Sequence, residues 1–134
     1  LVGCVQHARM LTQIGAGWAE RNASKPNVFW DAQKDDTKKF MDPQIKWQMA
    51  YLKLQPEEAL IVEFTPPTCD YWMIALHNHW METLDYRYHQ IDLNNATATA
   101  GPDGAIRCVV AHSDPGVPNW LHTGGRTSGP SATW

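Results

Sequence analysis

Two histidines separated by one residue, His77 and His79, are the first candidates for chemistry in this chain. Alternate residues of a β-strand point to the same face, so a strand through this segment would present both imidazoles together. Glu82 follows three residues after His79, and His112 lies on a later predicted strand. Imidazole and carboxylate groups are common ligands of divalent metal ions. The pattern therefore suggests a metal site of three histidines and one carboxylate.

The spacing of these residues argues against the metal site. The set resembles the arrangement in cupins, but Glu82 comes one or two residues too early, and no glycine follows at the expected distance. The alternative is that His77 and His79 are unrelated histidines at a strand end, one of them packed on an aromatic ring. We therefore favour no cofactor, and keep a divalent metal bound by His77, His79 and His112 as the alternative.

A second group of charged residues lies beside two tyrosines, Tyr86 and Tyr88. A carboxylate next to a histidine in a pocket can act as an acid–base pair. An arginine among carboxylates, as Arg87 is here, is more often a structural clamp, because buried charges must be paired. Both interpretations stay open. The candidate catalytic residues are Glu82, Asp85, His89 and His112.

Nucleophilic catalysis is not indicated. The run His112-Ser113-Asp114 contains the residue types of a hydrolase triad, but adjacent residues on a strand cannot adopt triad geometry, which brings distant positions together. The chain also has no Gly-x-Ser-x-Gly motif. Cys69 is better read as an inert buried thiol than as a nucleophile.

A loop rich in proline and glycine runs from Asp114 to Trp120. Pro115, Gly116 and Pro118 restrict its backbone, and rigid loops of β proteins often frame a binding site. The alternative is a structural corner, in which Trp120 covers the core and Asn119 bonds the backbone.

The elements that must position these residues are one helix and a series of short strands. Residues 3–21 predict a helix with an apolar stripe at His7, Leu11, Ile14 and Trp18. From residue 45 the period changes to two, which predicts strands at 45–51, 59–64, 71–79, within 86–100, at 106–112 and from 132. This order predicts a mainly β chain: an antiparallel β-sandwich of jelly-roll type with an N-terminal α-helix. Residues 1–44, helix and polar loop, are expected to pack on the sandwich formed by 45–134.

Bulk composition excludes several classes of protein. The 134 residues suit one domain. The 11 basic and 14 acidic residues give a net charge of −3. The sequence has no basic stripe that could bind the phosphates of a nucleic acid. A run of about 18 apolar residues, which a membrane span requires, does not occur. Three widely spaced cysteines form neither a disulfide framework nor a zinc pattern, which favours reduced thiols and a cytoplasmic setting.

The segment from Glu57 to Gly125 resembles the family called domain of unknown function 1214. The runs that carry the resemblance are EALIVE (58–63), PPTCDYW (66–72), WMETLDYRYH (80–89), PDG (102–104) and AHSDPGVPNWL (111–121). The resemblance implies a jelly-roll β-sandwich, the C-terminal part of a longer bacterial protein, and no settled activity. This chain departs from the family pattern at Pro130 and at His77 and His79, which weakens the metal hypothesis. The absent initiator Met and the stop at Trp134 lead us to expect a fragment, packed against an upstream domain or self-associated.

Three classes of function follow from these observations. The first is a domain that binds a small apolar or sugar-like ligand in an aromatic-lined cleft. The second is an enzyme of lipid, steroid or carbohydrate metabolism that uses a histidine–carboxylate pair. The third is a structural or assembly module of a larger protein. The candidate ligand-binding residues are Trp72, Trp80, Tyr86, Arg87, Asn119 and Trp120.

Overall fold

The computed structural model describes residues 2–31, 42 and 44–133. The first element is a long helix, α1 (Val2–Ala23), which confirms the predicted helix and extends it slightly at both ends. Most of the polar loop expected at 31–43 lies outside the described residues. Among the described residues, no helix is both long and apolar enough to cross a membrane.

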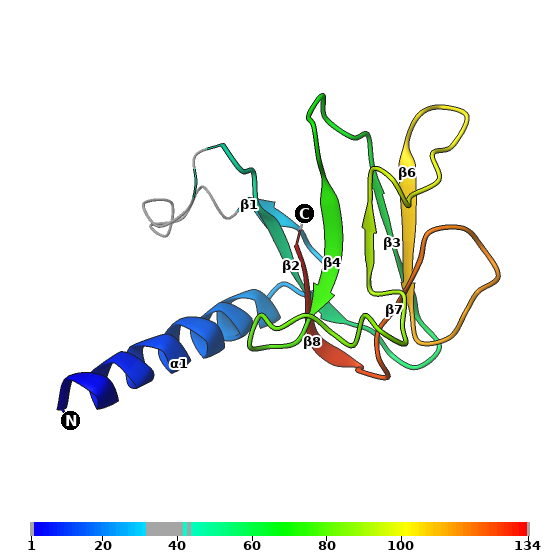
Figure 1. Ribbon diagram of the computed structural model, residues 1–134. Helices are drawn as coiled ribbons and strands as arrows, with labels where there is room; N and C mark the ends of the chain where they lie inside the picture. The colour runs from blue at the N-terminus through cyan, green and yellow to red at the C-terminus, as the bar shows by residue number, and fades with distance from the viewer. Residues whose placement is uncertain (1, 32–41, 43, 134) are drawn as a thin grey trace.

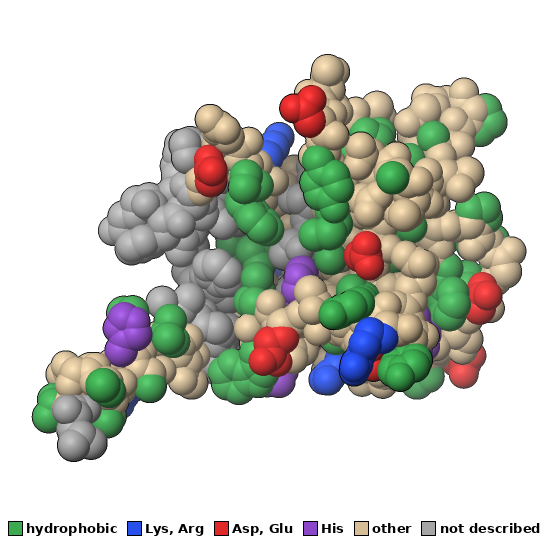
Figure 2. Space-filling model, viewed as in Figure 1, with side chains coloured by type: hydrophobic (Ala, Val, Ile, Leu, Met, Phe, Trp, Pro, Cys, Tyr) green, Lys and Arg blue, Asp and Glu red, His purple; other side chains and the backbone are tan. Residues whose placement is uncertain are grey.

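Helix α1 meets the rest of the molecule near its C-terminal end, where it contacts β2 and β8, and its first turns extend away from the body (Figure 1). The side chains of residues 2–13 are exposed, including His7 and Leu11 of the predicted apolar stripe. Figure 2 shows hydrophobic and histidine side chains on this projecting part. The expected packing of the helix on the sheet is therefore not seen for the described side chains of its first half.

In the described part of the chain, eight strands form two sheets. The larger sheet has the order β1-β2-β8-β4-β5 and is antiparallel throughout, with strands β1 (Trp30–Asp31), β2 (Gln48–Lys53), β4 (Met73–His77), β5 (Asp92–Asn94) and β8 (Ser128–Thr133). The smaller sheet has the order β3-β6-β7, with strands β3 (Ala59–Phe64), β6 (Ile106–Ala111) and β7 (Trp120–His122). β6 and β7 are parallel, and β3 and β6 antiparallel. The prediction of a mainly β fold with one N-terminal helix is thus confirmed, and the predicted antiparallel pairing holds for all strand pairs in the described part of the chain except β6–β7.

Both sheets contribute side chains to one hydrophobic core. Trp72, Ile74 and Leu76 point into it, as the alternation of apolar residues predicts. Every second residue of β6 does the same, and His112 follows just beyond the strand end. The buried strand residues of this core are Ala50, Leu52, Ile74, Leu76, Leu93, Ile106, Cys108, Val110 and Leu121.

The first predicted strand, 45–51, begins later than predicted and ends later. β2 starts at Gln48, ends at Lys53 and sends Ala50 and Leu52 into the core. Met49 is buried on the opposite face. Because α1 contacts β2, both faces of this strand are partly covered. The alternation of residues cannot then identify the core face.

The last strand lies in the middle of the larger sheet. β8 pairs with β2 on one side and with β4 on the other, whereas the sequence predicted a strand only from residue 132. Tyr51 pairs with Ser131 and Lys53 with Ser128, so the register shifts at the Gly129-Pro130 step. Proline has no amide hydrogen to donate and is tolerated in sheets at such irregularities. The bulge explains how a proline fits in a central strand.

Candidate functional site

The structure does not bring the predicted metal ligands together. β4 ends at His77, and His79 lies in the following turn with its ring 4.7 Å from that of Trp80. The prediction that both histidines share a strand face was therefore wrong. Asn78 organises this turn: its Oδ1 accepts hydrogen bonds from the amides of Trp80 and Glu82, at 2.9 and 3.1 Å. Across the described parts of the chain, no three histidine, cysteine or acidic residues are grouped to hold a metal ion.

Glu82 is engaged in the same turn. Its Oε2 accepts a hydrogen bond from Asn78 Nδ2 at 2.7 Å. Asp85 accepts from the Arg87 amide at 3.1 Å and lies 3.4 Å from the Arg87 Nε. All three of these charged side chains are exposed. The structure therefore places the predicted carboxylates in local turn contacts on the surface, and the clamp interpretation of Arg87 describes it better than a buried acid–base pair.

The candidate aromatic residues do not line one common cleft. Trp72 is only 9% exposed and packs in the core, where its ring meets that of Phe64. Trp80 is 46% exposed and Tyr86 68% exposed. Trp120 is half-buried and donates from its indole Nε1 to the Ala111 carbonyl at 3.3 Å. These residues are thus divided among the core, two turns and β7.

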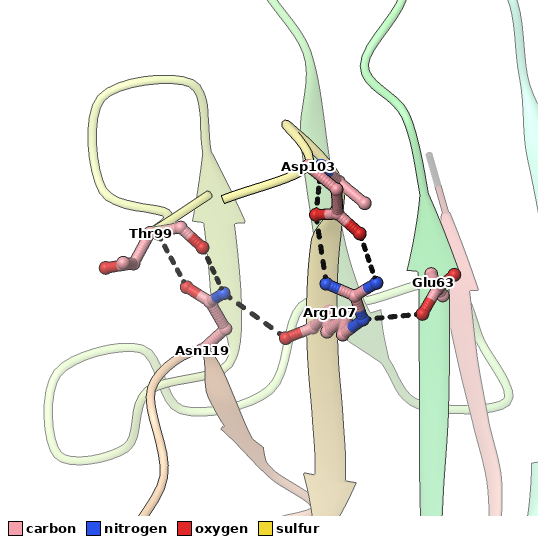
Figure 3. A network of polar contacts seen from close by, with 6 residues as sticks. Glu63, Thr99, Asp103, Arg107 and Asn119 are labelled. Atoms are coloured by element: carbon pink, nitrogen blue, oxygen red, sulfur yellow. Dashed lines mark hydrogen bonds and ion pairs between the residues drawn. The ribbon is translucent and has the colours of Figure 1, made fainter. Parts of the chain in front are cut away.

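Asn119 and its neighbours form a structural corner, as the alternative interpretation of the Asp114–Trp120 loop expected. Asn119 has a positive φ of 59°. Its Oδ1 accepts from the Thr99 amide at 2.8 Å, and its Nδ2 donates to the carbonyls of Thr99 and Arg107 at 2.7 and 3.2 Å (Figure 3). One side chain therefore ties the loop before β7 to β6 and to the segment before the 102–104 turn.

A charged network continues from this corner along β6. Arg107 donates from Nε to Glu63 Oε2 at 2.6 Å and from its terminal nitrogens to Asp103 at 3.2 and 2.6 Å (Figure 3). The hydrogen bonds from Arg107 lower the pKa of Asp103 to about 2, and the two carboxylates raise the pKa of Arg107. Asp103 belongs to the predicted Pro102-Asp103-Gly104 turn, which is present, with Gly104 at φ 77°.

Two histidines contact each other at the end of β7, and one of them, His122, was not predicted from sequence. The rings of His89 and His122 lie 4.3 Å apart. His112 Nδ1 lies 2.7 Å from Thr123 Oγ1, and its Nε2 lies 3.4 Å from the Leu54 carbonyl. Burial, and then the nearby His89, lower the pKa of His122 below its ordinary value. β7 has only three residues, too few for an alternating pattern to reveal it.

A small hollow opens elsewhere, between the two sheets. Its volume is about 140 Å³, and its lining is mostly apolar. It lies between the end of β3 and the starts of β2 and β4. None of its lining residues was predicted as a site residue, although Phe64 contacts the predicted ligand-binding residue Trp72. The lining residues are Phe29, Gln48, Val62, Glu63, Phe64 and Ile74.

Comparison with known proteins identifies structural relatives without an assigned activity. No protein-family model matches the chain, and no curated protein matches it in sequence. The chain is similar to an uncharacterised protein from Burkholderia cenocepacia, with 33% identity over 90% of its length and a TM-score of 0.83. It spans only 34% of that solved chain. It also shares its fold with the VPA0106 protein from Vibrio parahaemolyticus, at 15% identity, a TM-score of 0.51 and coverage of 70% of this chain and 26% of that one.

Proposed function

We propose that this chain is a ligand-binding domain that holds a small apolar group in the hollow between Phe29, Phe64 and Ile74. The observation that carries the proposal is this concave, mainly apolar space between the sheets. Ligand sites are usually concave and apolar with a few polar groups that fix orientation. Gln48 supplies such a group at this hollow, whereas the carboxylate of Glu63 is paired with Arg107.

The size of the hollow limits the ligand. Its volume is about 140 Å³, and an apolar cavity of about 150 Å³ holds one benzene molecule. Sites for drug-sized molecules measure roughly 300–1,000 Å³. The group bound here is therefore a single ring or a short branched alkyl chain. A larger ligand would have to leave its remaining part outside the hollow.

The proposal includes membership of the domain of unknown function 1214 family and a jelly-roll arrangement of the strands. The mainly β fold with two sheets around one core supports both. The coverage of 34% of the Burkholderia cenocepacia chain supports a further point, that the domain works as part of a longer protein. The assembly role is then complementary to ligand binding: the rest of the longer chain would pack on this domain.

Toluene and phenol are suitable probes of the hollow. We expect each to produce saturable NMR shifts in the signals of Phe29, Phe64 and Ile74. Val62→Phe should abolish these shifts, because Val62 lines the hollow and is half-buried. Ile61→Phe is the matched control, since the neighbouring side chain is 65% exposed and does not line the hollow. Equal binding to the Val62→Phe variant and to the wild-type chain would overturn the proposal.

A further inference from the structure

A contact between two histidines holds the segment after β4 against β7. The rings of His89 and His122 lie with centroids 4.3 Å apart and planes inclined by 30°. Beside them, the His122 amide donates a hydrogen bond to the Gln90 carbonyl at 2.7 Å. β7 is the edge strand of the three-stranded sheet. The turn at 85–90 therefore meets this edge through one backbone hydrogen bond and one pair of imidazole rings.

The ionisable groups that act on His122 are both histidines. His89 faces it from the 85–90 turn, and His112 acts on it from the end of β6. The ring of Trp120, on β7 itself, approaches His122 edge-on at 5.3 Å. In the 85–90 turn, Asp85 pairs with Arg87, and its backbone carbonyl accepts from the His89 amide at 3.2 Å.

Protonation of both rings turns the interaction between His89 and His122 from attractive to repulsive. Two neutral imidazoles can stack, but two imidazolium ions at this separation repel each other, and the half-buried position of His122 weakens solvent screening. The ordinary pKa of histidine lies close to neutral pH, so mild acidification is enough to protonate an imidazole ring.

We propose that His89 and His122 form an acid-sensitive latch, which holds the 85–90 turn on β7 when both rings are neutral and releases it when both are protonated. The pKa of His122 is lowered in the folded chain relative to its ordinary value of 6.5, through burial first and His89 second. The unlatched or unfolded chain then binds the proton more readily. The latch is therefore fully stable above about pH 6.5 and weakens as the pH falls from there through the lower folded pKa.

Backbone hydrogen exchange, measured by NMR at pH 7 and pH 5 and corrected for the intrinsic rates, tests the latch. The protection of the His122 amide should be lower at pH 5 than at pH 7, because the folded chain binds the proton less readily than the opened one. The Leu76 amide is an internal reference, because it donates to the Ile91 carbonyl, next to Gln90, at 2.9 Å but belongs to β4. Its protection should not change.

Two variants separate the latch from a general loss of stability at low pH. His89→Gln removes one of the two charges at an exposed position, so the His122 amide should lose less of its protection at pH 5 than in the wild-type chain. His79→Gln is the control, since this exposed histidine contacts Trp80 instead, and it should behave as the wild-type chain. The proposal is overturned if the wild-type protection of His122 is the same at both pH values. It is also overturned if His89→Gln loses protection to the same extent as the wild-type chain.

Discussion

The ring of Phe64 meets the indole of Trp72 edge-on, with ring centroids 5.2 Å apart and planes at 86°. Phe64 ends β3 of the smaller sheet, and Trp72 directly precedes β4 of the larger one. The contact therefore joins the two sheets. Phe64 also lines the hollow, so the wall of the proposed ligand site rests on a core residue. An edge-to-face pair of this kind adds to the burial of the two rings.

Replacing Trp72 should destabilise the fold. Trp72→Ala removes a large buried side chain and leaves a cavity, which costs about 3–5 kcal/mol in the free energy of unfolding. Trp72→Phe should cost less, because a ring remains opposite Phe64. Trp80→Ala, at a position that is 46% exposed, is the control and should change the free energy by less than about 1 kcal/mol. Urea unfolding followed by circular dichroism measures all three, and equal losses for the alanine variants would contradict the assignment of Trp72 to the core.

Asn119 should stabilise the fold in two separate ways, through its backbone conformation and through its three hydrogen bonds. Asn119→Gly keeps the positive φ available and loses the bonds to Thr99 and Arg107, for an expected loss of about 1–3 kcal/mol. Asn119→Ala should cost about 1 kcal/mol more, because an alanine at φ 59° is strained. The two variants are compared by urea unfolding. Equal stability of the Asn119→Ala and Asn119→Gly variants would contradict the role of the positive φ.

Elements with a clear local pattern could be predicted from the sequence. β3 has the predicted bounds, and the alternation in β6 identified its core face, because each strand has one side in the core and the other exposed or less buried. α1 was recognised from its period, although its first half is exposed. β8 was placed too late, because Gly129 and Pro130 are unusual inside a strand. Only the pairing with β2 and β4 shows that a bulge accommodates them.

The candidate sites were harder to predict for a different reason. The hollow takes Phe29, Gln48, Val62 and Ile74 from four separate segments, and none of these side chains has a type that indicates chemistry. The charged and aromatic residues of the segment 80–89 that were predicted as site residues lie in exposed turns. A single sequence shows residue types but not sheet pairing, and sheet pairing decides which of these side chains converge.

The central position of β8 predicts unequal effects of two truncations. Removal of residues 128–134 leaves β2 and β4 without the strand between them, so their backbone groups lose partners and the chain should fail to fold. Removal of residues 1–11 takes away exposed turns of α1 and should change the free energy of unfolding by less than about 1 kcal/mol. Circular dichroism and thermal unfolding distinguish the two outcomes. A cooperative transition in the chain without β8 would contradict its role as a central strand.

The three cysteines should differ in reactivity. Cys108 is fully buried, and burial raises the pKa of its thiol to about 12, whereas Cys4 and Cys69 are exposed. The expectation that Cys69 is buried was therefore wrong. Because the thiolate is the reactive form, a thiol reagent such as Ellman's reagent at pH 8 should modify only the two exposed cysteines of the folded chain. All three should react in urea. Cys69→Ser provides the control and should leave one reactive thiol before unfolding. Rapid reaction of Cys108 in the folded chain would show that the core opens readily.

The ion pair between Asp103 and Arg107 should make part of the stability sensitive to acid. The pKa of Asp103 falls from 3.8 to about 2 on folding, through the Arg107 hydrogen bonds first. The folded chain therefore holds the proton less tightly than the unfolded chain. The contribution of this group is complete above about pH 4 and is lost as the pH falls towards 2. The difference in urea midpoint between wild type and Asp103→Asn should shrink across this window. Because the pair is exposed, 1 M NaCl should shrink the difference at pH 5 as well. A difference that stays constant from pH 5 to pH 2 would show that Asp103 acts through turn geometry rather than through its charge.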